Sequence, residues 1–95
     1  MNELMEYFRD KHGTRKKGIL YAVDKNKIGW SLWNPKYGIK FNRENGVKAA
    51  RGRAIKGTHS ECPHSLTAAF QKMCDRAERY YQKALNWGLF LSHIL

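Results

Sequence analysis

The sequence has few cysteines, few prolines, few acidic residues and no long apolar run. Two cysteines in 95 residues are too few for a disulfide-stapled secreted scaffold and fit a reducing compartment. The most apolar stretch, residues 88–95, is far shorter than the roughly 20 residues that cross a bilayer. We therefore expect a single soluble, intracellular domain, residues 1–95, without membrane association. A chain of this size supports one small cleft or a flat binding face.

Acidic residues are the scarcer charged class, and their shortage indicates which partners to expect. Eight Asp and Glu residues stand against eighteen Lys and Arg residues, so the formal net charge is +10. Residues 1–57 carry fourteen basic and five acidic residues, whereas residues 58–95 carry four and three. A positive field of this kind concentrates polyanions and speeds their association. The favoured partners are nucleic acid, an anionic nucleotide or an acidic protein.

The segment 41–57 concentrates the positive charge. It holds five of the eighteen basic residues and has glycines at positions 46 and 52. Asn42 is the expected N-cap, and Val47, Ala50 and Ala54 recur on one narrow helical face. We predict a short helix that these small apolar residues dock onto the rest of the chain. Its cations form either a solvated surface or a contact for phosphates, and both interpretations stay open.

The N-terminal residues predict a further helix. Leu4, Met5 and Phe8 fall on one face of a helix over residues 2–11, and Gly13 follows as a stop signal. Residues 14–18 then form a basic loop.

A β-hairpin follows. Residues 19–23 and 28–33 alternate with a period of two around a turn at residues 24–27. Asn34-Pro35-Lys36 ends the second strand, because proline has no N–H to donate to a ladder. Residues 37–41 either add a short third strand or lead directly into the basic helix.

The C-terminal part predicts the longest helix. Ser65 is the expected cap of a helix over residues 66–87, and Gly88 follows as a natural C-terminal residue. The apolar tail, residues 89–95, either packs on the hairpin or joins two chains in a homodimer. The expected fold is α+β, with a small antiparallel sheet packed against this helix. The apolar stripe of the helix consists of Leu66, Phe70, Met73, Ala77, Tyr80, Ala84 and Trp87.

One pattern resembles a known family. It runs Asn34-Pro35-Lys36, Phe41-Asn42-Arg43, Gly46, Ala50 and Gly52-Arg53-Ala54. This resembles small, mostly uncharacterised proteins of tailed bacteriophages, in which an NPK-like turn precedes a basic helix of the form FNxxxGxxxAxGRA. The resemblance covers residues 28–57, and the chain departs from it at Asn45, Val47 and Ala49. It implies a phage accessory protein in the cytoplasm of the bacterial host, and it implies no mechanism.

The basic helix and its flanks supply the predicted ligand site. Phosphates are bound by Lys, Arg and helix N-termini, and nucleobases stack on aromatic rings for about 1–3 kcal/mol each. Trp30 and Trp33 have opposite parity in their strand, so at least one is expected to point away from the hairpin core. The predicted ligand-binding residues are Arg43, Lys48, Arg51, Arg53, Lys56, Lys36, Tyr37 and Trp33.

Metal binding and catalysis have weaker support in the sequence. The donors His59, Cys62, His64 and Cys74 suit zinc, but their spacing matches no common structural zinc pattern. A nucleophile and a base are available within residues 59–64, yet nothing in the sequence fixes their geometry. We therefore expect no enzyme, no metal and no cofactor.

These observations lead to two hypotheses of function. The first is a non-enzymatic phage protein for host takeover or counter-defence that binds nucleic acid or a nucleotide signal through the basic, glycine-containing helix. The alternative is an inhibitor of an acidic host defence enzyme, which uses the long helix and the apolar C-terminal tail.

Overall fold

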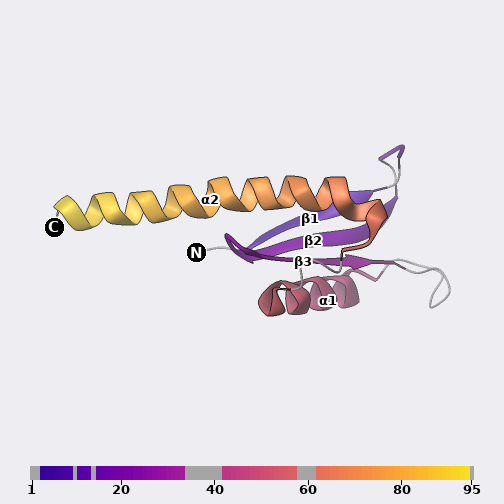
Figure 1. Ribbon diagram of the computed structural model, residues 1–95. Helices are drawn as coiled ribbons and strands as arrows, with labels where there is room; N and C mark the ends of the chain where they lie inside the picture. Colours follow the sequence, from indigo (N-terminus) through magenta and orange to yellow (C-terminus); the bar gives the residue numbers. More distant parts are fainter. Residues whose placement is uncertain (1–2, 10, 14, 34–41, 58–61, 95) are drawn as a thin grey trace.

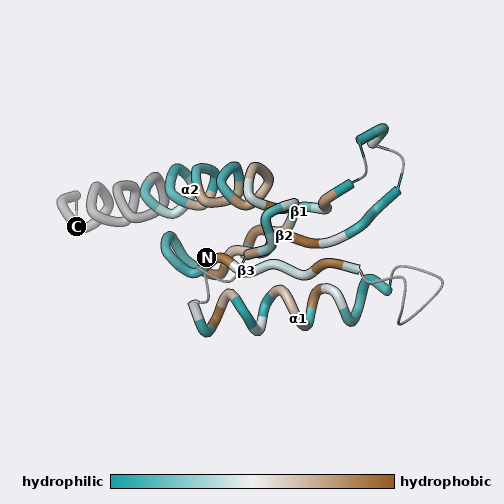
Figure 2. The backbone as a smooth tube through the Cα atoms, turned by 45° about the vertical axis from the view of Figure 1, so that its right-hand side comes forward, coloured by the Kyte–Doolittle hydropathy of each residue, from teal (hydrophilic) through white to brown (hydrophobic). Residues whose placement is uncertain are grey.

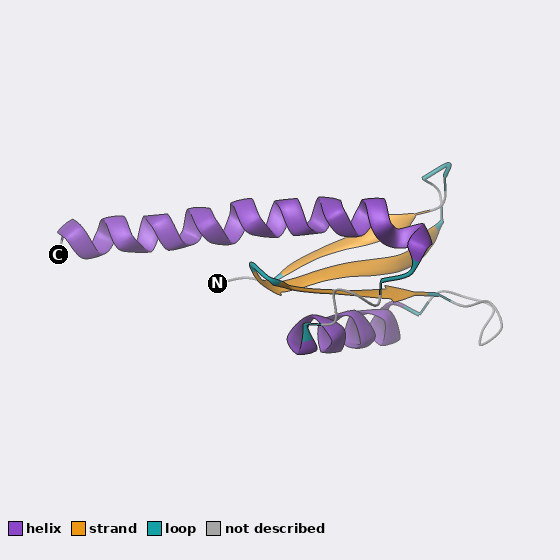
Figure 3. Cartoon of the chain, viewed as in Figure 1, coloured by secondary structure: helices purple, strands orange, loops and turns teal. Residues whose placement is uncertain are grey.

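The chain folds into three layers, with a small sheet between two helices (Figure 1). The computed structural model describes residues 3–9, 11–13, 15–33, 42–57 and 62–94, and side chains as far as residue 82. The architecture confirms the predicted α+β class (Figure 3). The elements in chain order are β1 (Leu4–Arg9), β2 (Lys16–Asp24), β3 (Lys27–Leu32), α1 (Arg43–Lys56), a 3-10 turn (His64–Leu66) and α2 (Thr67–Ile94).

Strand β1 replaces the helix predicted for residues 2–11, which is wrong. It pairs antiparallel with β2, with Leu4 opposite Ala22 and Phe8 opposite Gly18. The apolar residues of this short segment fit a helical period and a strand period equally well, and period alone cannot separate them. Pairing with β2 satisfies the backbone of β1 and buries Leu4 to 6% exposure.

The predicted β-hairpin of residues 19–33 is confirmed. Strands β2 and β3 pair antiparallel, and Lys25 donates its backbone N–H to the Asp24 carboxylate at 2.7 Å in the turn. The basic loop predicted for residues 14–18 is wrong at its end, because β2 already begins at Lys16. The possible third strand, residues 37–41, lies outside the described residues.

Helix α1 also agrees with the prediction. The Asn42 side chain accepts a hydrogen bond from the Asn45 N–H, and Gly57 ends the helix in the left-handed region with φ 73°. Ala50 and Ala54 are fully buried against the sheet. They lie against Gly29 of β3, where an added Cβ would stand 2.0 Å from the Ala50 carbonyl oxygen and 2.3 Å from the Ala54 nitrogen. The helix can come this close only because position 29 has no side chain.

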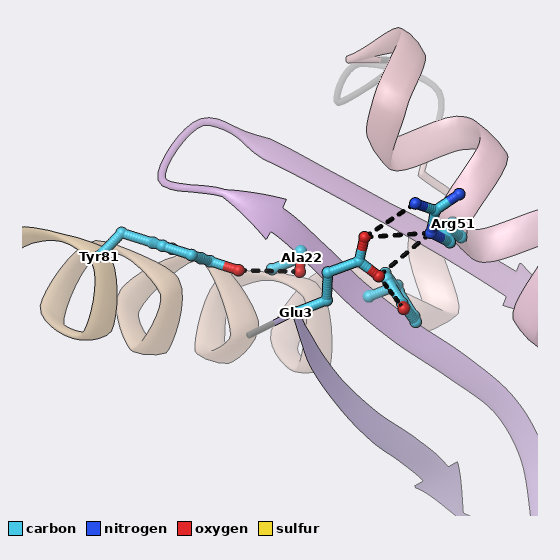
Figure 4. A network of polar contacts seen from close by, with 5 residues as sticks. Glu3, Ala22, Arg51 and Tyr81 are labelled. Carbon is cyan, nitrogen blue, oxygen red and sulfur yellow. Dashed lines mark hydrogen bonds and ion pairs between the residues drawn. The ribbon is translucent and has the colours of Figure 1, made fainter. Parts of the chain in front are cut away.

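Helix α2 covers the opposite face of the sheet. Its Phe70, Met73 and Ala77 share one buried cluster with Leu20 and Ile28. Polar contacts tie the same helix to the strands. The Tyr81 hydroxyl donates to the Ala22 carbonyl at 3.2 Å (Figure 4), Lys25 donates to Gln82 at 3.1 Å, and Arg76 pairs with Glu6 at 2.7 Å.

The bounds of α2 differ from the predicted range of 66–87. Ser65 lies in the 3-10 turn, and α2 begins at Thr67. The helix continues through Gly88 to Ile94, so Gly88 does not end it. A glycine inside a helix costs about 1 kcal/mol relative to alanine, and the long helix tolerates that cost. Figure 1 shows α2 running past the end of the sheet toward the C-terminus.

The contact between β3 and α1 predicts opposite effects for two glycine-to-alanine substitutions. We expect Gly29→Ala to lower the free energy of unfolding by about 1–3 kcal/mol, because the new methyl group would overlap backbone atoms of α1. Gly52→Ala is the matched control on helix α1, because a Cβ at position 52 meets nothing within 4 Å. We expect it to raise stability by up to about 1 kcal/mol.

Urea unfolding followed by circular dichroism measures both changes. A Gly29→Ala chain as stable as the wild type would contradict the close packing of α1 on β3.

Candidate functional site

Arg51 of α1 is committed to an ion pair inside the chain. Its guanidinium donates from Nε and Nη2 to the Glu3 carboxylate at 3.0–3.1 Å (Figure 4). The Tyr21 hydroxyl donates to the same carboxylate. The hydrogen bonds from Arg51, followed by that from Tyr21, lower the pKa of Glu3 below its ordinary value of 4.5. Arg51 therefore links α1 to the start of β1.

Arg53 holds the other side of α1. Its Nη1 donates to the backbone carbonyl of Trp30 at 2.7 Å, and its guanidinium carbon lies 3.9 Å from the centre of the Trp30 ring. Trp30 lies on β3, an edge strand of the sheet, so Arg53 satisfies an edge carbonyl and covers one face of the indole. This predicted ligand residue thus also fastens α1 to the sheet.

The remaining predicted ligand residues have different surroundings. Lys48 and Lys56 are exposed on α1. Trp33 is half-buried, its backbone N–H donates to Lys17 at 2.7 Å, and its indole Nε1 is buried without a hydrogen-bond partner in the described structure. Lys36 and Tyr37 lie outside the described residues. The phosphate contact predicted for these side chains stays a prediction.

A cluster of cations around Tyr7 escaped the sequence analysis. Lys16 places its Nζ 4.2 Å from the centre of the Tyr7 ring, and the guanidinium carbon of Arg9 lies 5.8 Å from it. Arg43, the first residue of α1, donates from Nε to the Tyr7 hydroxyl at 2.7 Å. Three cations from three elements thus converge on one half-buried tyrosine.

A β-bulge produces this convergence. Phe8 pairs with Gly18 but Arg9 pairs with Lys16, so Lys17 is an extra residue on β2. Because of the extra residue, Lys16 lies on the opposite face of the sheet from the one that strict alternation would give. This is the same face as Tyr7 and Arg9. The signal in the sequence was the Tyr7-x-Arg9 spacing, which places both residues on one face only if the segment is a strand.

The cluster belongs to a larger basic surface. Figure 2 shows hydrophilic residues gathering where β1 ends and β2 begins. No carboxylate of the described residues forms an ion pair with the cations here, because the ion pairs among these residues join Glu3 to Arg51 and Glu6 to Arg76. Asp10 lies outside the described residues. We call this surface the basic end, and its exposed members are Arg9, Lys11, Arg15, Lys16, Lys17 and Arg43.

The cysteines and histidines do not form a site in the described structure. Within it, no group of three or more His, Cys, Asp or Glu side chains can hold a metal ion, and His59 lies outside it. Burial raises the pKa of the Cys62 and Cys74 thiols, which lowers their thiolate fraction and therefore their reactivity. The serine, histidine and glutamate that could accompany Cys62, residues 59–61, also lie outside the described part.

Comparison of the chain with protein-family models, with curated proteins and with solved structures gives no match. The helices of the described chain include none whose length and apolar character would let it cross a membrane.

The Glu3–Arg51 pair predicts a pH-dependent contribution to stability. Because the folded-state pKa of Glu3 is lowered, its contribution is fully present above the unfolded-state value near 4.5 and is lost as pH falls through the lower folded-state value. We expect Glu3→Gln to lower the free energy of unfolding at pH 7 by only a small amount, because the pair is exposed. The same substitution should flatten the dependence of stability on pH below about pH 4.5.

Urea unfolding of the wild type and of Glu3→Gln, repeated between pH 3 and 7 in steps of about half a pH unit, measures this effect. Arg51→Gln is the paired variant and should remove the larger part of the same pH dependence, because the hydrogen bond from Tyr21 to Glu3 remains. If Arg51→Gln retains the full acid-side loss, Arg51 is not the cause of the lowered pKa.

Proposed function

We propose that this chain is a non-enzymatic phage accessory protein that binds a phosphate-bearing ligand in the cytoplasm of the bacterial host. The observation that carries the proposal is the basic end, where six exposed cations gather without an ion pair to any described carboxylate. Such a surface attracts polyanions and gains free energy when phosphates release their counterions. The ligand class is nucleic acid or a nucleotide.

The side chains of the basic end favour binding over catalysis. Lys and Arg supply positive charge and hydrogen-bond donors, but neither is a ready nucleophile or general base while it is protonated. The thiols of Cys62 and Cys74 have raised pKa values, which disfavours them as nucleophiles. A bound ligand would therefore be retained and not turned over.

Helix α1 contributes to the proposed surface in two ways. Arg51 and Arg53 fix the helix against the sheet, and this positions Arg43 at Tyr7. Lys48 and Lys56 are exposed and extend the positive charge along the helix. The predicted role of α1 as a phosphate contact thus becomes a proposal in which its first residue and its lysines meet the ligand.

A second candidate function is inhibition of an acidic host enzyme. Helix α2 runs beyond the sheet (Figure 1), and residues 83–95 contain many apolar residues in the sequence. This segment could bind a host protein or a second copy of the chain, which would give a homodimer, while the basic end steers an acidic partner toward it.

Binding of phosphates should be strongly salt-dependent. We expect the purified protein to bind a fluorescently labelled single-stranded oligodeoxythymidylate, with log K falling linearly against log salt. Three to six neutralised phosphates correspond to a slope of about −2 to −4 for a single strand. Fluorescence anisotropy from about 50 to 200 mM salt, with a mononucleotide as competitor, measures the slope and separates nucleic acid from nucleotide binding. Absent or salt-independent binding to both ligands would refute the proposal.

The two candidate functions predict different results when the tagged chain is used to capture host proteins. If the protein binds nucleic acid, any host proteins retained through it should be lost after nuclease treatment. If it inhibits an acidic enzyme, one stoichiometric partner should survive nuclease and be released by high salt. A chain that lacks residues 83–95 is the matched control, provided that circular dichroism shows it folded. It should retain nucleic acid and lose the protein partner.

A further inference from the structure

We propose that Arg9, Lys16 and Arg43 together hold one phosphate group of the ligand beside Tyr7. The inference rests on the proposed function, and it assigns that function to a defined site. The three cations come from β1, β2 and α1, so the site exists only when the hairpin end and the start of α1 are both in place.

The distances define a compact site. Lys16 and Arg9 lie over the Tyr7 ring at 4.2 and 5.8 Å, and Arg43 reaches the Tyr7 hydroxyl at 2.7 Å. All three cations are exposed, so a ligand can approach from solvent. The positive end of the α1 dipole begins at the same point, because Arg43 is the first helical residue.

The arrangement has an electrostatic cost that a bound anion would remove. Arg9 and Lys16 are directly opposite each other on paired strands, and like charges in that position are destabilising. The β-bulge creates the juxtaposition, since without the extra residue Lys16 would face the α2 side of the sheet. No described carboxylate offsets the repulsion with an ion pair.

The chemistry of the site suits phosphate and not a nucleobase. Two guanidinium groups and one ammonium group match the geometry and charge of phosphate oxygens. The Tyr7 ring, in contrast, already carries Lys16 and Arg9 over it and offers little room for a stacked base. The ligand group is therefore a phosphate, either a terminal monoester or a backbone diester, and recognition here is independent of base sequence.

The decisive variant is the double substitution Arg9→Gln/Lys16→Gln, because both side chains are exposed and neither fastens α1. The probe is a twelve-nucleotide oligodeoxythymidylate labelled at its 3′ end. We expect the double variant to bind at least about tenfold more weakly at 50 mM salt, and its salt slope to be smaller by about 0.7, the value for one neutralised phosphate of a single strand. Lys27→Gln/Lys72→Gln is the matched control, because it also removes two exposed cations. Lys27 is the first residue of β3 and Lys72 lies on α2, and neither belongs to the basic end. We expect it to change the slope by less than about 0.3.

The outcomes separate this inference from the proposed function. A wild-type chain that binds neither the oligonucleotide nor a mononucleotide overturns both. If the wild-type chain binds but the two double variants lose the same amount of affinity, only the site is overturned. The positive charge of the whole surface, and not a defined site, would then attract the ligand. Arg43→Gln completes the test if its circular dichroism melt shows it folded, and it should weaken binding like the Arg9/Lys16 variant.

A second comparison identifies the source of the phosphate. The same oligonucleotide is prepared with a 5′-phosphate and with a 5′-hydroxyl group. If the site takes a terminal monoester, the 5′-phosphate should tighten wild-type binding severalfold and have no effect on the Arg9→Gln/Lys16→Gln variant. If it takes a backbone diester, both oligonucleotides should bind equally and both should weaken in that variant. A 5′-phosphate effect that persists in the variant would contradict the site.

Discussion

The close approach of helix α1 to strand β3 is the constraint on which the rest of the structure depends. Gly29 lets the backbone of α1 at Ala50 and Ala54 lie directly against the strand, and any side chain at position 29 would push the helix away. The contact also fixes the rotation of the helix about its axis. Arg51 then reaches Glu3 on one flank, and Arg53 reaches Trp30 on the other. The arginines reinforce a position that the small residues set.

The same contact determines where positive charge is presented. With α1 held by its buried alanines, its first residue lies at Tyr7, beside the bulged end of the β1–β2 hairpin. Arg51 and Arg53, both predicted to bind a ligand, instead fasten α1 to the strands. Arg9 and Lys16, which lie outside the basic helix, meet Arg43 around Tyr7. The proposed function therefore depends on the junction of three elements and not on the basic helix alone.

Local patterns predicted much of this fold, and long-range pairing explains the errors. The hairpin and the capped helix α1 follow from alternation, turn residues and Asn42, all of which act within a few positions. Strand β1 could not be assigned because six residues fit both periods, and only pairing with β2 decides between them. The cluster at Tyr7 was missed for the same reason, since its cations are at positions 9, 16 and 43 and meet only through the sheet register and the docking of α1.

The most direct test of this account is to map bound phosphate on the wild-type chain by following backbone amide resonances during titration with a 5′-phosphorylated oligodeoxythymidylate. The account predicts that the largest shifts cluster in residues 7–9, 15–18 and 43–46, where the hairpin end meets the start of α1. Shifts concentrated along α2, or spread evenly over the surface, would contradict it.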